Sequence, residues 1–165
     1  MRAVVSTVSS ARVTVDGETV GQVDAEVDGE FRGALLALVG VGRGDGPEKW
    51  STVARKIAEL RLLPPRGGSW SDPRNVSVTD NDAAVLVVSQ FTLAGSTVKG
   101  RRPSWSGAAP AAEAEVAVDT VVAELRARGV RELRARGVRV ATGRFGAEMS
   151  VESVNEGPFT VVVEA

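Results

Sequence analysis

The N-terminal stretch MRAVVSTVSSARVTVDGETVGQV (residues 1–23) decides the fold class. Apolar and polar residues alternate along it, and the Asp16-Gly17 pair interrupts the alternation. Such alternation is typical of strands with one buried face, and an Asp-Gly pair favours a tight hairpin turn. The stretch therefore predicts two antiparallel strands joined at Asp16 and Gly17.

Two continuous apolar runs predict further strands. Residues 33–46 (GALLALVGVGRGDG) read as a central strand followed by a glycine-rich loop, and residues 83–93 (AAVLVVSQFTL) read as a buried strand. Residues 138–164 are expected to add two or three more strands. The chain is thus rich in β-structure.

Apolar residues at helical spacing predict two main helices, one from Pro47 to about residue 63 and one over residues 111–129. Residues 64–75 and 89–110 read as loops, because glycine and proline are frequent there. We expect a compact α/β (α+β) fold with mixed or antiparallel sheets, formed as a single domain over residues 1–165.

The amino-acid composition narrows the possible chemistry. Histidine, cysteine and tyrosine are all absent from the 165 residues. Ser-His and Cys-His nucleophile pairs, the usual zinc sites and disulfide frameworks are therefore excluded. We expect no metal and no cofactor, so that catalysis would depend on carboxylates, hydroxyls, backbone groups or the substrate itself.

No leader-like segment precedes the first strand, and no apolar stretch approaches the roughly 18 residues of a membrane span. The absence of cysteine suits a reducing compartment. These features predict a soluble, cytoplasmic protein with no membrane partner.

Positive charge gathers in the C-terminal half, although the net charge is −1. Residues 124–144 contain seven arginines and only two glutamates. With Lys99, Arg101 and Arg102, these arginines could form a phosphate-binding face, and a solvated helix surface is the alternative.

The segment ELRARGVR occurs twice in succession, at residues 124–131 and 132–139. Gly129 suits a helix C-cap, or a helix interior at a cost of about 1 kcal/mol. The repeat therefore predicts a longer helix or a second short turn, and a surface insertion without a role is the simplest interpretation.

The stretch SVNEGPFTVVVEA (153–165) sets a Gly-Pro step directly against a strand-like apolar run. Proline removes a backbone donor and glycine removes side-chain packing, so the pair usually ends a strand or turns a corner. On its own, this step predicts a turn.

Two motifs, SQFTL (89–93) and NEGPFT (155–160), resemble those of the D-aminoacyl-tRNA deacylase family. The opening MRAVV, the VTVDGE hairpin, KGRRPSW (99–105) and RARGVRVATGRFGAEM (134–149) extend the resemblance along nearly the whole chain. It implies a homodimeric enzyme that hydrolyses the ester between a D-amino acid and the 3′-terminal adenosine of tRNA, and that also accepts glycine.

The resemblance also implies how handedness is selected. The family's Gly-Pro peptide is cis and reaches into the active site of the other subunit, and the corresponding residues here are Asn155, Gly157, Pro158 and Thr160. The two carbonyl groups would accept hydrogen bonds from the substrate ammonium and would collide with an L side chain. A D side chain would remain in solvent, and glycine would have nothing to collide.

The catalytic motif corresponds to Ser89, Gln90, Phe91 and Thr92, none of which is a strong general base near neutral pH. We therefore expect the ribose 2′-hydroxyl of the terminal adenosine to help activate water, with backbone amides around Gln90 and Phe91 stabilising the oxyanion. The resemblance implies the same RNA-assisted route. Thr92 would then bind the substrate's amino or carbonyl group.

The resemblance further implies that Phe145 and Met149 line the adenosine site. We expect Lys99, Arg101 and Arg102 to approach the acceptor-stem phosphates, and a solvated loop is the alternative. Phe91 and Met149 could equally be core residues.

The chain departs from the family pattern after MRAVV, where relatives commonly carry Gln-Arg and the arginine helps to hold the Gly-Pro loop. Ser6 and Thr7 stand there instead. A tRNA-binding protein without turnover is therefore an alternative, and an amidase that uses Thr92 as nucleophile is a remoter one.

Overall fold

The predicted hairpin is present in the computed structural model, which describes residues 1–128 and 139–165. Strand β1 (Arg2–Val15) pairs antiparallel with β2 (Glu18–Asp24). Asp16 and Gly17 have φ angles of 51° and 81°, the left-handed conformation that this tight turn requires.

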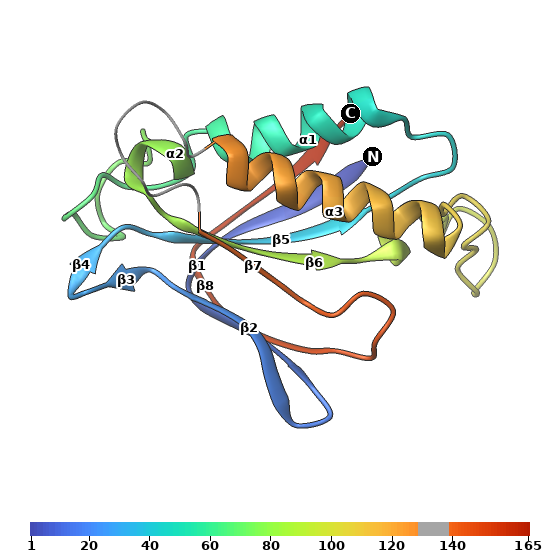
Figure 1. The fold of residues 1–165 in the computed structure, drawn as a ribbon, viewed down its shortest axis with the longest axis horizontal. Coiled ribbons are helices and arrows are strands. Elements are labelled where there is room, and N and C mark those ends of the chain that lie inside the picture. Colours follow the sequence, from blue (N-terminus) through green and yellow to red (C-terminus); the bar gives the residue numbers. More distant parts are fainter. Residues whose placement is uncertain (129–138) are drawn as a thin grey trace.

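Strand β1 pairs with three other strands of a six-stranded mixed sheet (Figure 1). Its N-terminal half pairs antiparallel with β5 (Ala34–Gly40), and β8 (Ser150–Glu164) runs antiparallel along its other side. Strands β6 (Ala84–Ser89) and β7 (Arg139–Thr142) extend the sheet from β5 by parallel pairing. Two short strands, β3 (Glu26–Val27) and β4 (Glu30–Phe31), form a separate ribbon.

Helices α1 (Pro47–Glu59) and α3 (Ala111–Arg128) lie side by side on one face of the sheet (Figure 1). Pro47 occupies the start of α1, where its missing N–H costs no hydrogen bond. A one-turn helix, α2 (Val78–Asn81), and a 3₁₀ helix, η1 (Phe91–Ala94), complete the described helices. The expected α+β architecture with two main helices is therefore confirmed.

The main core lies between the sheet and the two helices, where Leu35, Ile57 and Leu125 are fully buried. A smaller apolar cluster, which includes Leu36 and Leu86, fills the opposite face. Successive side chains of β5 and β6 point alternately into these two clusters, so both faces of the two strands are buried. This explains their continuous apolar runs.

The first ELRARGVR copy enters α3 as far as Arg128. The remainder of that copy and the second copy up to residue 138 lie outside the described residues. In the parts of the chain that the structure does describe, no helix has the length and apolar character needed to cross a membrane.

Candidate active site

The SQFTL stretch turns sharply where β6 ends, and the neighbouring strand holds the turn. The N–H of Gln90 donates to the carbonyl oxygen of Val39 on β5 at 2.7 Å. Gly40 allows this close approach, because a Cβ atom there would lie 2.7 Å from the Cβ of Leu93 and 2.8 Å from the carbonyl oxygen of Gln90. Within the turn, Nε2 of Gln90 donates to the hydroxyl oxygen of Thr92 at 2.5 Å.

The loop that follows folds back over this turn. The backbones of Ser96 and Ser104 exchange hydrogen bonds of 2.8 and 2.9 Å. Trp105 packs against the bare Cα of Gly95 and meets the ring of Phe91 edge-on, with ring centroids 5.7 Å apart. The loop thereby covers one side of the SQFTL turn.

Lys99, Arg101 and Arg102 lie between the paired Ser96 and Ser104, in the part of the loop that projects away from the turn. All three side chains are exposed. They present three positive charges to solvent on the loop that follows the SQFTL turn.

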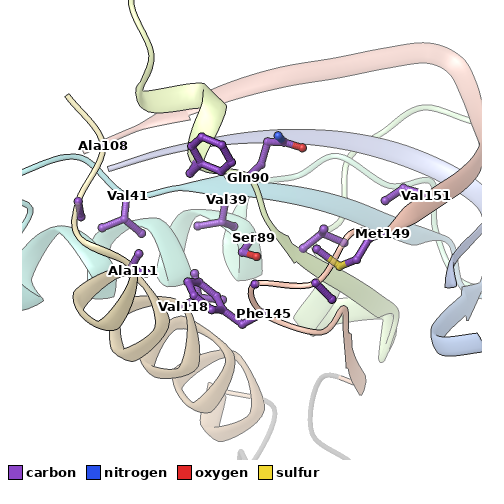
Figure 2. Close-up of a pocket in the computed structure, with 16 residues that line it drawn as sticks. Val39, Val41, Ser89, Gln90, Ala108, Ala111, Val118, Phe145, Met149 and Val151 are labelled. Atoms are coloured by element: carbon purple, nitrogen blue, oxygen red, sulfur yellow. The ribbon is translucent and has the colours of Figure 1, made fainter. Parts of the chain in front are cut away.

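A cavity of about 480 Å³ opens next to the SQFTL turn (Figure 2). Five of the residues expected at the site line it together: Ser89, Gln90, Phe91, Phe145 and Met149. The remaining lining is apolar and comes from β5, β6, the start of β8, the first half of α3 and neighbouring loops: Val39, Val41, Val88, Ala108, Ala109, Ala111, Ala114, Val118, Gly146, Ala147 and Val151.

The cavity is electrically neutral. None of its described lining residues carries a carboxylate, an amine or a guanidinium group. Its polar side chains are the hydroxyl of Ser89 and the amide of Gln90. Across residues 1–128 and 139–165, no group of three or more carboxylates could hold a metal ion. The cavity suits a largely apolar group, with Ser89 and Gln90 as its polar partners.

A buried ion pair stabilises the loop behind the cavity wall at Val41. The carboxylate of Asp45 lies 2.6 Å from the N-terminal ammonium of Met1 and 2.9 Å from Nζ of Lys49. It also accepts the N–H of Gly42 at 2.6 Å. Burial disfavours the charged carboxylate, but these three donors outweigh that effect and hold the pKa of Asp45 below its ordinary value of 3.8.

The Gly-Pro step does not end strand β8, so the general interpretation of a turn is wrong here. Asn155 pairs with Val8 and Thr160 pairs with Ser6, so the four residues 156–159 face Thr7 alone. The chain therefore bulges out of the sheet and returns to it. Within the bulge the Gly157–Pro158 peptide bond is cis.

Asn155 and Thr160 tie the base of this bulge. Asn155 accepts the N–H of Phe159 at 3.1 Å and donates to the hydroxyl oxygen of Thr160 at 2.9 Å. The hydroxyls of Thr160 and Ser6 lie 2.9 Å apart in a further hydrogen bond. Ser6 thus takes part in holding the bulge.

Thr7 closes the bulge from the sheet side. Its side chain is fully buried, and its hydroxyl donates to the carbonyl oxygen of Glu156 at 2.7 Å. Gly157 and Pro158 remain exposed, and neither lines the cavity of its own chain. The structure thus brings five of the expected site residues together around one cavity and leaves the NEGPFT residues on a separate exposed bulge.

The family model and the similar curated proteins are both described as tRNA deacylases. Residues 4–164 match a family model described as D-Tyr-tRNA(Tyr) deacylase. Similar curated proteins are named D-aminoacyl-tRNA deacylase. The one from Corynebacterium urealyticum is 52% identical over 99% of both chains, and the one from Streptomyces coelicolor is 49% identical over 99% of both.

Two solved structures share the fold. A c-Myc DNA Unwinding Element Binding Protein gives a TM-score of 0.82 at 31% identity, over 100% of this chain and 99% of its own. A probable eukaryotic D-amino acid tRNA deacylase gives a TM-score of 0.72 at 19% identity, over 99% of this chain and 98% of its own.

Proposed function

Because the chain belongs to the D-aminoacyl-tRNA deacylase family, we propose that it hydrolyses the ester bond of D-aminoacyl-tRNA. The products are the free D-amino acid and the tRNA. Glycyl-tRNA is a second substrate, since glycine has no side chain by which a handedness filter could reject it.

The observation that carries this proposal is the neutral cavity beside the SQFTL turn. Its volume of about 480 Å³ and apolar walls fit the adenosine at the end of tRNA. Phe145 and Met149 line the cavity and would contact the adenine ring, while Ser89 and Gln90 supply its polar side chains (Figure 2). The ester would then lie against the turn formed by residues 90–92.

We propose that the substrate supplies the group that activates water, because the cavity's described lining offers no base. The ribose 2′-hydroxyl of the terminal adenosine orients and polarises a water molecule. This water adds to the ester carbonyl carbon, the bond to the ribose oxygen breaks, and the departing ribose oxygen takes the proton that the water loses. Thr92 contributes binding, with its hydroxyl oriented by Gln90.

The oxyanion donor is the backbone N–H of Phe91. The first N–H groups of a helix have no partner within it, and Phe91 begins η1. The N–H of Gln90, by contrast, is engaged with Val39. An N–H fixed by the fold can stabilise the charge that develops on the carbonyl oxygen without reorganising.

The bulge at residues 156–159 serves as the handedness filter of a second subunit. Gly157 and Pro158 are exposed and lie outside the cavity of their own chain, as expected of residues that act in a partner's site. Their carbonyl oxygens would accept the substrate ammonium and occupy the space that an L side chain needs.

The basic residues between Ser96 and Ser104 would contact the RNA itself. Lys99, Arg101 and Arg102 are exposed on the loop that follows the SQFTL turn, where phosphates of the acceptor stem would pass. Such contacts position the tRNA without reading its sequence.

The test is a single-turnover assay with one tRNA charged with the D- and L-forms of the same amino acid, and with a D-charged tRNA that lacks the terminal 2′-hydroxyl. We expect the D-ester to be hydrolysed and the L-ester to be spared. Loss of the 2′-hydroxyl should slow hydrolysis by about 100-fold or more, the usual size of a general acid–base contribution. Thr92→Ala should have the smaller effect.

Two results would contradict this scheme. If Thr92→Ala is more harmful than loss of the 2′-hydroxyl, Thr92 is the nucleophile. If D-aminoacyl-tRNA binds tightly but is not hydrolysed, the chain is a tRNA-binding protein of the same fold. Competition by uncharged tRNA with and without the 2′-hydroxyl serves as the control for binding.

A further inference from the structure

Arg74 reaches the β8 bulge from a distant part of the chain. It lies in the loop between α1 and α2, and its Nη2 donates to the carbonyl oxygen of Glu156 at 3.0 Å. Glu156 immediately precedes the Gly157–Pro158 pair. The same carbonyl oxygen accepts the hydroxyl of Thr7, so Arg74 and Thr7 fix one peptide group between them.

Two aromatic rings hold the guanidinium in place. Its central carbon lies 4.9 Å from the ring centroid of Phe159 and 5.5 Å from that of Trp70, within the range of cation–π attraction. Trp70 in turn packs edge-on against Phe31 and rests on the main core. The guanidinium therefore bridges a ring fixed to the core and a ring of the bulge itself.

The contact with Gly157 is tight. A Cβ atom on this residue would lie 3.0 Å from Nη2 of Arg74. Gly157 has φ +127°, a conformation that residues with a side chain rarely adopt. Arg74 thus packs directly against the backbone that the handedness filter uses.

The other nitrogens of the Arg74 guanidinium are also confined. Nη1 donates to the carbonyl oxygen of Trp70 at 3.4 Å, and Nε is buried without a hydrogen-bond partner among the described residues. The planar fork and the two rings together determine where the side chain sits.

We propose that Arg74 is a positioning residue that sets the handedness filter by fixing the backbone of residues 156–158. The short side chain of Thr7 secures the bulge only from the sheet side, and Arg74 secures it from the loop side. The bulge is thereby held at a fixed height above the sheet, which determines how far the carbonyl oxygens of Gly157 and Pro158 project. This inference rests on the proposed function.

The first test compares hydrolysis of the D- and L-forms of one aminoacyl-tRNA by Arg74→Met and Arg74→Lys. Methionine keeps an unbranched side chain but has neither the positive charge nor the N–H donors of the guanidinium. Lysine keeps the positive charge but lacks the planar guanidinium. We expect the ratio of kcat/KM for D over L to fall about 10-fold or more in Arg74→Met and by less in Arg74→Lys. The matched control is Arg55→Met, which removes an exposed arginine that pairs with Glu59 at 3.6 Å within α1, away from the bulge and from β8. It should leave the ratio unchanged.

The second test does not depend on activity. Hydrogen–deuterium exchange at the amide of Phe159, which donates to Asn155, should be about 10-fold faster in Arg74→Met and unchanged in Arg55→Met. Unchanged exchange would overturn the positioning role, and faster exchange with an unchanged D/L ratio would overturn its link to specificity.

If the wild-type protein hydrolyses neither ester, the proposed function fails, and the exchange measurement alone decides whether Arg74 holds the bulge. Should Arg74→Met fail to fold, Arg74→Lys carries both measurements.

Discussion

At the residue scale, Asp45 is a buried charge whose ion pairs contribute to stability. Its side chain is only 7% exposed, and it neutralises the N-terminal ammonium of Met1, a residue that is itself buried. Removing one partner of such a pair leaves the other charge uncompensated, which costs far more than losing a pair at the surface.

We predict that Asp45→Asn lowers the free energy of unfolding by about 3 kcal/mol at pH 7. Because folding lowers the pKa of Asp45, its stabilisation is fully present above its ordinary pKa of 3.8 and is lost as the pH falls through the folded-state value. The difference between wild type and variant should therefore shrink below pH 4. Urea denaturation at several pH values measures this.

The control is Glu152→Gln, which removes the 60%-exposed partner of Arg12. It should cost less than about 1 kcal/mol at neutral pH. A loss equal to that of Asp45→Asn would show that burial of the ion pair does not set its contribution.

Some site residues could be predicted from the sequence and others could not, for a physical reason. Ser89 to Thr92 and Asn155 to Thr160 lie in motifs with distinctive residue types. Cavity walls such as Val39 and Val118 are apolar residues that pack in a core equally well, so nothing in the sequence distinguishes them. Arg74 acts on a residue 82 positions away, a contact that only the folded chain creates.

At the scale of elements, the SQFTL turn depends on how closely it approaches β5. Gly40 is the residue that permits this approach, since a Cβ atom would overlap both Leu93 and Gln90. The position of the turn, and of the N–H of Phe91 within it, is thus set by a missing side chain on the neighbouring strand.

We predict that Gly40→Ala lowers single-turnover deacylation by about 10- to 100-fold, because a displacement near 1 Å is enough to disturb catalytic geometry. It should also cost about 1–3 kcal/mol of stability through overpacking. Gly17→Ala is the matched control, since its φ of +81° strains a side chain in open space at the β1–β2 turn. Equal loss of activity in both variants would mean that stability, and not the position of the turn, explains the effect.

The elements themselves were largely predictable because their signals are local. The alternation in residues 1–23 and the helical spacing after Pro47 describe single segments. The four-residue helix α2 was missed, although Ser77 and Asp80 form a capping box at its start, because one turn is too short to show periodicity. The continuation of β8 through Gly157 and Pro158 was also missed, since the pairing with β1 on both sides of the bulge is a tertiary property.

At the scale of the whole molecule, several large apolar side chains of β8 are exposed. Val154 and Val162 are 53% and 60% exposed, and Phe159 on the bulge is 36% exposed. Exposed apolar side chains along one strand favour contact with a second protein surface. We therefore expect a second subunit to contact β8.

We predict that Val154→Glu converts a dimer to a monomer and abolishes deacylation, because it places a charge in the proposed interface. Analytical ultracentrifugation measures the oligomeric state. Val116→Glu changes an equally exposed valine (57%) on α3 and should remain dimeric. A wild-type protein that sediments as a monomer while hydrolysing D-aminoacyl-tRNA would rule out a filter shared between subunits.

Strand β1 fixes the spacing between the SQFTL turn and the bulge at residues 156–159. Ala3 pairs with Val39, which anchors Gln90, and four residues further along Thr7 faces the bulge that carries Gly157 and Pro158. Adding or deleting one residue between positions 3 and 7 would change that spacing by about 3.3 Å and reverse the inward and outward faces of the strand. Evolution can therefore lengthen this chain elsewhere, but the count of residues along this stretch is expected to stay constant.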